Sequence, residues 1–118
     1  MSTILETYKV QFSKRIINKR TLKLIYSIND VLDQCIADYK TVDEVNNFLI
    51  AEINKVLNGV SSSETIISES MVSVVISSDT TKFYQDPNYS PTASPDYSIP
   101  TQDFKVIAQA WLSYLQNN

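Results

Sequence analysis

Residues 71–85 read MVSVVISSDTTKFYQ, and they carry the clearest change of pattern in the chain. The stretch is rich in β-branched and aromatic residues on both sides of Ser78-Asp79, a pair typical of a tight turn. This pattern predicts an antiparallel hairpin with strands at about 64–77 and 80–85. Because the segments around it have helical periodicity, we expect an α+β fold in one domain.

The segment after the hairpin contains all four prolines of the chain, within residues 86–100. Proline lacks the N–H donor that a helix needs, so the segment is predicted to be a loop, with a short edge strand at 96–99 left open. Thr101 then begins a predicted helix at 101–116, which we expect to pack on the sheet. Its apolar face consists of Phe104, Ile107, Ala108, Trp111, Leu112 and Leu115.

Apolar residues before residue 60 recur every three to four positions, which predicts amphipathic helices at about 3–17, 21–39 and 41–58. The first is open to a second interpretation, because residues 8–12 also alternate as in a strand. The apolar stripe of the second helix consists of Leu22, Ile25, Ile28, Val31, Leu32, Cys35, Ile36 and Tyr39.

The ends of the second and third helices carry further signals. Ser27 and Asn29 are poor residues for the middle of a helix, so the second helix can begin later than residue 21. Thr41 and Glu44 have the spacing of a capping box, and Gly59 suits the left-handed end of a helix. The buried face of the third helix is predicted to contain Val45, Phe48, Leu49, Ile53, Val56 and Leu57.

The chain has no histidine, one glycine and one cysteine, and these counts exclude several classes of chemistry. Without histidine it cannot form a Ser-His-Asp or Cys-His site or the usual zinc site. One glycine is too few for a P-loop or a dinucleotide-binding turn. Cys35 lies on an apolar stripe and is predicted to be buried. We therefore expect no enzyme, no metal and no cofactor or small-molecule substrate.

Charge is distributed unevenly. Residues 1–24 hold six basic residues and one acidic residue, a net +5, whereas residues 25–118 hold four basic and twelve acidic residues, a net −8. We interpret the basic segment as a solvated helix face and do not expect a nucleic-acid partner, because no stacking aromatic residues accompany the charges. The sequence shows no apolar run long enough for a membrane span and no signal-peptide pattern, so we expect a cytoplasmic protein without a membrane partner.

The C-terminal part of the sequence resembles small cytoplasmic immunity proteins of bacterial polymorphic-toxin and contact-dependent growth-inhibition systems. In that group a sheet often ends in a hydrophobic-Pro step, followed by a helix of the form Phe-x-x-Ile-x-x-x-Trp-Leu. The residues that carry the resemblance are Lys82 to Asp86, Tyr97 to Pro100, Phe104, Ile107, Trp111, Leu112, Tyr114 and Leu115.

This resemblance implies a non-enzyme that binds and neutralises one cognate toxin domain, for example a nuclease with a basic cleft. An acidic body suits such a partner, although acidic residues also serve solubility alone. The alternative function is a non-catalytic phage or mobile-element accessory protein that binds a host protein or nucleic acid. We expect a monomer or weak dimer.

Two surfaces are candidates for the toxin. One is an acidic helix face, and the other is the proline-rich loop, whose tyrosines suit the centre of an interface. In the alternative interpretation, Tyr84 and Tyr97 pack on the sheet and the loop only connects strands. The candidate residues are Asp30, Asp33, Asp38, Asp43 and Glu44 on the helix face, and Tyr84, Asp86, Tyr89, Asp96 and Tyr97 around the loop.

Overall fold

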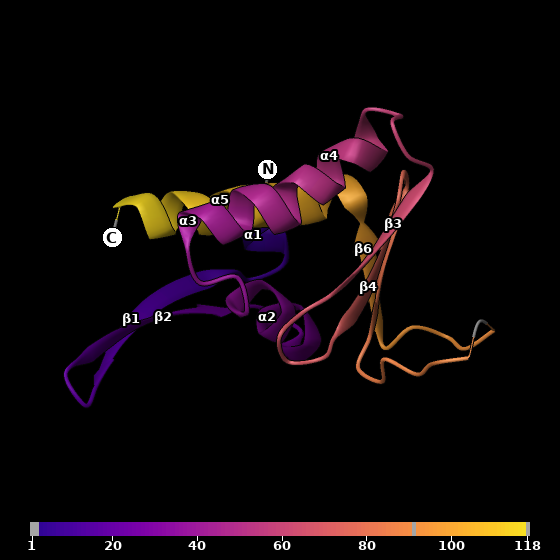
Figure 1. Ribbon diagram of the computed structural model, residues 1–118. Coiled ribbons are helices and arrows are strands. Elements are labelled where there is room, and N and C mark those ends of the chain that lie inside the picture. The colour runs from indigo at the N-terminus through magenta and orange to yellow at the C-terminus, as the bar shows by residue number, and fades with distance from the viewer. Residues whose placement is uncertain (1–2, 91, 118) are drawn as a thin grey trace.

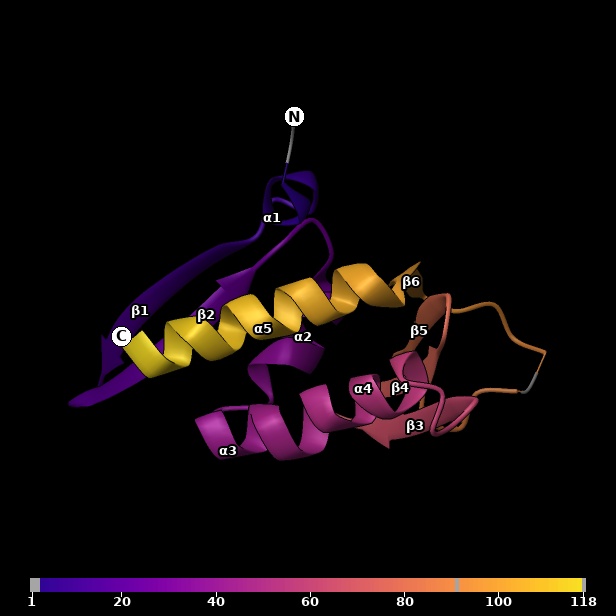
Figure 2. The ribbon, with the colours of Figure 1, turned by 90° about the horizontal axis from the view of Figure 1, so that it is seen from above.

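The main sheet has four antiparallel strands in a computed structural model that describes residues 3–90 and 92–117. Figure 1 shows the sheet, and Figure 2 shows that its strands lie side by side in chain order: β3 (Ser63–Ile67), β4 (Ser73–Ser77), β5 (Thr80–Tyr84) and β6 (Tyr97–Pro100). Val74, Ile76 and Phe83 are fully buried. Their alternation with more exposed residues gives the sheet one face against the core.

The predicted strand at 64–77 is wrong as a single strand, because the chain reverses between β3 and β4. Met71 N–H donates to the Ser68 carbonyl at 2.8 Å, and Met71 has a φ of 68°. The predicted strand at 80–85 is present as β5. The edge strand left open at 96–99 is present as β6, so the predicted loop 86–100 ends at residue 96; residue 91 of that loop lies outside the described residues.

The C-terminal helix α5 (Thr101–Asn117) follows β6 directly and packs on the sheet, which confirms the predicted α+β class. The rings of Phe104 and Phe83 meet edge to face, with centroids 5.3 Å apart. The buried Thr101 hydroxyl bonds to Thr81 Oγ1 at 2.8 Å and also donates to the Ser77 carbonyl. Thr101 therefore fastens the start of the helix to the sheet.

The N-terminal part corrects two predictions. The helices expected at 3–17 and 21–39 are wrong over most of residues 8–29. These segments form α1 (Ile4–Thr7), β1 (Gln11–Ile17), β2 (Arg20–Tyr26) and α2 (Asp30–Ala37). β1 and β2 pair with each other to form an antiparallel two-stranded sheet, and we call residues 11–26 the ribbon.

The turn of the ribbon explains the error. Asn18 and Lys19 both have positive φ, 52° and 67°, as in a two-residue hairpin turn whose twist matches the flanking strands. The strand interpretation of residues 8–12 is therefore the correct one from Gln11 onward. Some apolar residues that were expected on buried helix faces are exposed instead: Ile16, Leu22 and Ile28 expose 78%, 43% and 52% of their surfaces.

The second helix begins later than residue 21, as the presence of Asn29 in the sequence allowed. Asn29 is the N-cap of α2, and its side-chain oxygen accepts from the backbone N–H groups of Val31 and Leu32. The third predicted helix, 41–58, is confirmed as a continuous helical segment. It comprises α3 (Val42–Glu44), the π-helical turn η1 (Val45–Ile50) and α4 (Ala51–Leu57), and Gly59 follows with a φ of 76°.

The core lies among α2, α5, the α3–α4 segment and the inner face of the sheet. Seen from above, α5 lies between the ribbon and the α3–α4 segment (Figure 2). Phe12 of β1 joins this core by stacking on Tyr114, with centroids 5.0 Å apart. The bulky members of the core that are fully buried include Leu32, Ile36, Leu49, Ile53, Phe83, Phe104 and Ile107. Cys35 is buried as predicted.

Trp111 is expected to contribute more to stability through packing than through its hydrogen bond. It is 1% exposed, and its indole N–H donates to the Tyr39 carbonyl at 2.8 Å. Trp111→Ala should lower the free energy of unfolding by about 3–5 kcal/mol. Trp111→Phe, which keeps a ring but leaves the carbonyl unpaired, should cost only about 1–3 kcal/mol. Urea unfolding followed by circular dichroism measures both, and equal losses would contradict this ranking.

Candidate functional site

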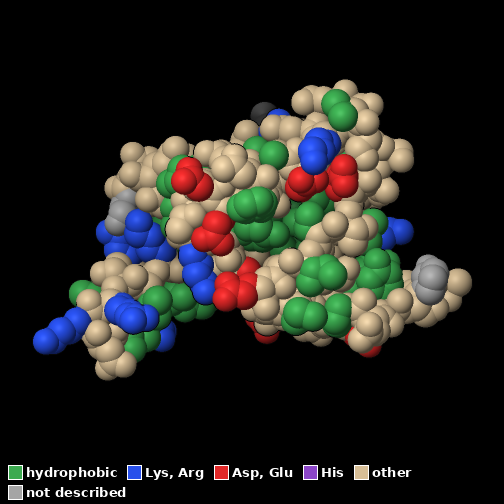
Figure 3. Space-filling view, in the orientation of Figure 1, with side chains coloured by type: hydrophobic (Ala, Val, Ile, Leu, Met, Phe, Trp, Pro, Cys, Tyr) green, Lys and Arg blue, Asp and Glu red, His purple; other side chains and the backbone are tan. Residues whose placement is uncertain are grey.

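An acidic groove with an apolar floor lies between the α3–α4 segment and β3, with a volume of about 390 Å³. Phe48 and Ile67 expose 62% and 56% of their surfaces there, although both are large apolar residues. Figure 3 shows acidic side chains grouped around exposed hydrophobic side chains on one face of the molecule. The carboxylates that line the groove are Asp38, Glu44, Glu52 and Glu69.

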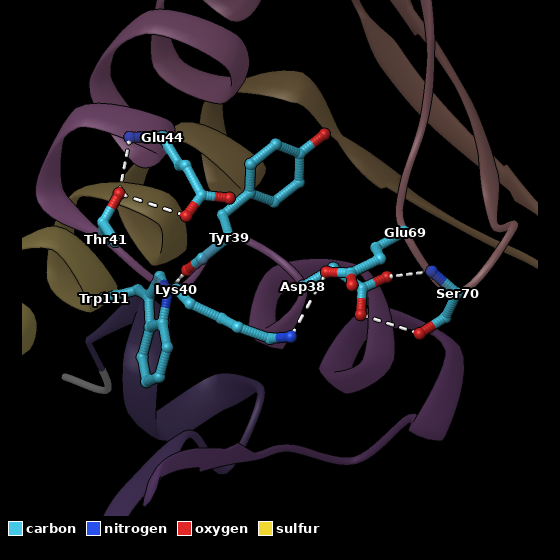
Figure 4. Close-up of polar contacts among 8 residues, drawn as sticks. All are labelled: Asp38, Tyr39, Lys40, Thr41, Glu44, Glu69, Ser70 and Trp111. Atoms are coloured by element: carbon cyan, nitrogen blue, oxygen red, sulfur yellow. Dashed lines mark hydrogen bonds and ion pairs between the residues drawn. The ribbon is translucent and has the colours of Figure 1, made fainter.

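The α2 end of the groove is held by a polar clamp to the turn between β3 and β4. Both oxygens of Asp38 accept hydrogen bonds from Ser70, one from the backbone N–H and one from the hydroxyl, each at 2.7 Å (Figure 4). Beside them Lys40 Nζ pairs with Glu69 at 3.2 Å. The clamp therefore joins two segments about thirty positions apart and sets the width of this end.

The helix side of the groove is fixed by the predicted cap. Thr41 Oγ1 accepts from Glu44 N–H at 3.1 Å, which confirms the N-cap, and its hydroxyl also donates to the Glu44 carboxylate at 3.1 Å. Tyr39 forms part of the lining, and burial raises the pKa of its hydroxyl well above the usual range. Glu44 is thus held at the rim and Tyr39 in the neutral form.

Two of the five predicted acidic residues, Asp38 and Glu44, line this groove. Asp43 is exposed in the first turn of α3, beside Glu44, but it does not line the groove. Asp30 is exposed at the start of α2. Asp33 is half-buried and does not line the groove. The pKa of Tyr97 is raised mainly by burial and, second, by the nearby charge of Asp33.

The second predicted surface is a smaller hollow in the loop, of about 300 Å³, lined by four of the five candidate residues. Tyr84 and Tyr89 stack with their centroids 3.8 Å apart, and Tyr84 is buried. The carboxylates of Asp86 and Asp96 already accept hydrogen bonds from the backbone. Asp86 accepts from the N–H of Asn88, and Asp96 accepts from the N–H of Gln85. The polar groups of this hollow thus serve mainly to shape the loop.

Tyr97 does not line the hollow. It packs on Phe83 of the neighbouring strand, with centroids 5.9 Å apart. Tyr84 and Tyr97 therefore contribute to packing on the sheet, as the alternative interpretation held, and Tyr89 is the more accessible member of the stacked pair.

The groove residues that the prediction did not name as site residues include Phe48, Glu52, Ile67 and Glu69. Phe48 was assigned to the core, and this is wrong because the π-helical turn places Leu49 and Ile50 inward and leaves Phe48 outside. The i, i+4 spacing of Phe48 and Glu52 was the available signal that they share a face. Ile67 and Glu69 reach the groove only through the β3–β4 reversal.

Among residues 3–90 and 92–117, no cluster of three or more potential ligands is arranged to hold a metal ion. Over the same residues no helix has the length and apolar character needed to cross a membrane. Comparison with models of known protein families, with curated proteins and with solved structures finds no match.

Asp33→Asn is expected to stabilise the protein at neutral pH. Asp33 Oδ1 is buried without a hydrogen-bond partner in the described part of the chain. Burial raises the pKa of Asp33 above its usual value, partly offset by hydrogen bonds from Ser27. Folding therefore disfavours the ionised carboxylate. This penalty is absent below the ordinary pKa, develops as the pH rises from the ordinary pKa to the raised one, and is complete above the raised one.

Thermal unfolding followed by circular dichroism tests this expectation. The midpoint of Asp33→Asn should exceed that of wild type at pH 7, and the difference should disappear at about pH 3. Asp30→Asn is the matched control, because it removes the same charge from an exposed position on the same helix. If the midpoint of Asp33→Asn stays above that of wild type in acid, or if the control raises the midpoint equally, the burial of the Asp33 charge is not the cause.

Proposed function

We propose that this protein is an immunity protein that binds a cognate bacterial toxin domain and neutralises it by covering its active surface. The observation that carries the proposal is the groove between the α3–α4 segment and β3. It combines exposed Phe48 and Ile67 with four surrounding carboxylates. An apolar centre inside a polar rim is the usual anatomy of a protein-binding surface.

The exposure of Phe48 supports a partner. Burying a phenylalanine side chain stabilises a protein by about 1.5–3 kcal/mol, yet the fold leaves this one 62% exposed. Val45, Leu49 and Ile50 of the same turn are buried, so the core does not require Phe48. An exposed aromatic ring beside Ile67 is suited to insert into a pocket of a second protein.

The charges of the groove support a basic partner. Asp38, Glu44, Glu52 and Glu69 all line it, and residues 25–118 as a whole hold four basic and twelve acidic residues. Such a field accelerates encounter with a positively charged surface, for example the substrate cleft of a nuclease toxin.

Each groove carboxylate also has a hydrogen-bond partner within the chain. Ser70 binds Asp38, Thr41 binds Glu44, Lys55 binds Glu52 and Lys40 binds Glu69. The rim is therefore ordered before a partner arrives, which lowers the entropic cost of association. This arrangement suits tight binding, and the proposed role needs no chemical step.

Co-expression tests the function directly. The product of the adjacent upstream gene is expressed with and without this protein, and growth is measured together with the mass of any complex. We expect the neighbour to be toxic alone, growth to be restored by this protein, and a stable one-to-one complex to form. Absence of toxicity from neighbouring gene products, with no complex, would overturn the proposal.

Phe48→Ala is expected to weaken the toxin complex by about 10- to 100-fold, because the aromatic centre of an interface carries much of the binding energy. The variant should unfold at the same urea concentration as wild type, since Phe48 is largely exposed. Val60→Ala is the control, because it truncates another exposed apolar side chain outside the groove. Isothermal titration calorimetry measures both affinities. Equal losses of affinity in the two variants would show that Phe48 does not lie in the interface.

Glu69→Gln is expected to slow association with the toxin while leaving dissociation nearly unchanged. Glu69 lies at the exposed rim, and its pair with Lys40 is between side chains that are 69% and 64% exposed. Rim charges act mainly on the encounter rate. Stopped-flow measurements at low and high salt test this, with Asp79→Asn, in the turn at the far end of β4, as control. A change confined to dissociation would contradict it.

A further inference from the structure

The ribbon carries an unusual combination of side chains for a part of a free protein. Residues 11–26 contain five basic residues and no acidic one. Its apolar residues Ile16, Ile17 and Leu22 are 78%, 48% and 43% exposed. The turn of the ribbon projects away from the helices (Figure 1). The basic residues are Lys14, Arg15, Lys19, Arg20 and Lys23.

The ribbon lacks internal charge compensation. Lys14 and Lys23 lie directly opposite each other in the β1–β2 register, and like charges at such positions are destabilising. Lys23 is anchored, because its Nζ donates to the Leu115 carbonyl near the end of α5 at 3.2 Å. A two-stranded hairpin is marginally stable on its own, so exposed aliphatic residues at its far end indicate a surface that a partner covers.

The side chains define the chemistry of that partner. Nucleic acid would satisfy the cations, but its phosphates would leave Ile16, Ile17 and Leu22 uncovered, and the acidic body of the protein would repel it. A surface that is both acidic and apolar satisfies both sets of residues. The groove of this same chain is such a surface, with four carboxylates around exposed Phe48 and Ile67.

We propose that the ribbon of one copy docks in the groove of a second copy, and that the exchange is reciprocal. Figure 3 shows the basic ribbon and the acidic groove on the same face of the molecule. A two-fold axis that lies in the plane of this face, midway between the two surfaces and at right angles to the line joining them, turns a second copy to meet the first face to face. Each ribbon then lies on the partner's groove. The contact is then self-complementary and closes at two copies.

Strand edges on both surfaces favour the same contact. In the described part of the chain β1 and β2 pair only with each other, and β3 pairs only with β4. Both strands of the ribbon and β3 are therefore edge strands. β3 (Ser63–Ile67) contains neither Lys nor Pro, the residues that commonly protect an edge. The edge that borders the groove is therefore open to an extended segment such as the ribbon.

Such a dimer covers the surface to which the toxin is proposed to bind. Dimer and toxin complex then exclude each other, so that the dimer is a reserve form and the monomer is the form that neutralises. This consequence depends on the proposed function. The dimer itself depends only on the complementarity of the ribbon and the groove.

Charge reversal tests the dimer. The ribbon variant carries Arg15→Glu and Arg20→Glu, and the groove variant carries Glu52→Lys and Glu69→Lys. Wild type should show a mass that rises from one to two copies with concentration in sedimentation equilibrium. Each variant alone should raise the dimer dissociation constant on the order of 100-fold or more, because like charges then face each other at both contacts.

An equimolar mixture of the two variants should dimerise again. In the mixed pair one contact joins the reversed ribbon to the reversed groove, and the other joins the two unchanged surfaces. The control variant, Lys82→Glu with Lys105→Glu, makes the same charge change outside the ribbon and should dimerise as wild type does. Failure of the mixture to restore the dimer, or loss of the dimer in the control, would overturn the reciprocal contact.

Two other outcomes also overturn it. One is a wild-type protein that stays monomeric at all concentrations. The other is a monomer that binds a short DNA duplex in fluorescence anisotropy and loses this binding in the ribbon variant, which would assign the ribbon to nucleic acid. Neutralisation of the toxin is measured in a separate growth assay. The monomeric ribbon variant should still protect cells from the toxin, so loss of the dimer and failure of the immunity function give different results.

Discussion

The buried hydrogen bond from Trp111 Nε1 to the Tyr39 carbonyl, 2.8 Å long, determines how the segment after α2 lies on α5. A buried carbonyl without a partner is costly, so this bond and the packing of the indole act together at one point of the core. Asp38 and Lys40 flank that carbonyl in the chain and bind Ser70 and Glu69 across the groove. The shape of the acidic groove is thus set by a contact on its inner side.

The fold class could be predicted from sequence because its signals are local and agree with one another. The apolar spacing of α5, the cap at Thr41 and Gly59 after α4 each specify one element. The ribbon could not be predicted in the same way, because its apolar residues fit a helical period as well as a strand. Asn18, in the left-handed conformation of a two-residue turn, was the local signal for the hairpin.

The candidate site was predictable only in part. Asp38 and Glu44 could be named because the sequence predicts an acidic helix face that contains Asp38, with the capping box of the next helix, which contains Glu44, beside it. Ile67 and Glu69 come from the opposite side of the groove, and their position depends on a chain reversal at Met71, a residue that rarely adopts positive φ. Phe48 faces outward because of a π-helical turn, which a regular period cannot indicate.

Segregation of charge links the two proposals to the fold. Isolated ion pairs at a surface contribute little to stability, so folding gains little from placing the ribbon cations near the groove carboxylates of the same chain. The ribbon instead keeps five cations and three exposed aliphatic residues away from the acidic groove on the same face. The ribbon and the groove are complementary but lie apart in one molecule, so they can contact each other only between two copies of the protein. Any basic partner of the groove then competes with the ribbon of a second copy, which makes protein concentration a regulator of binding.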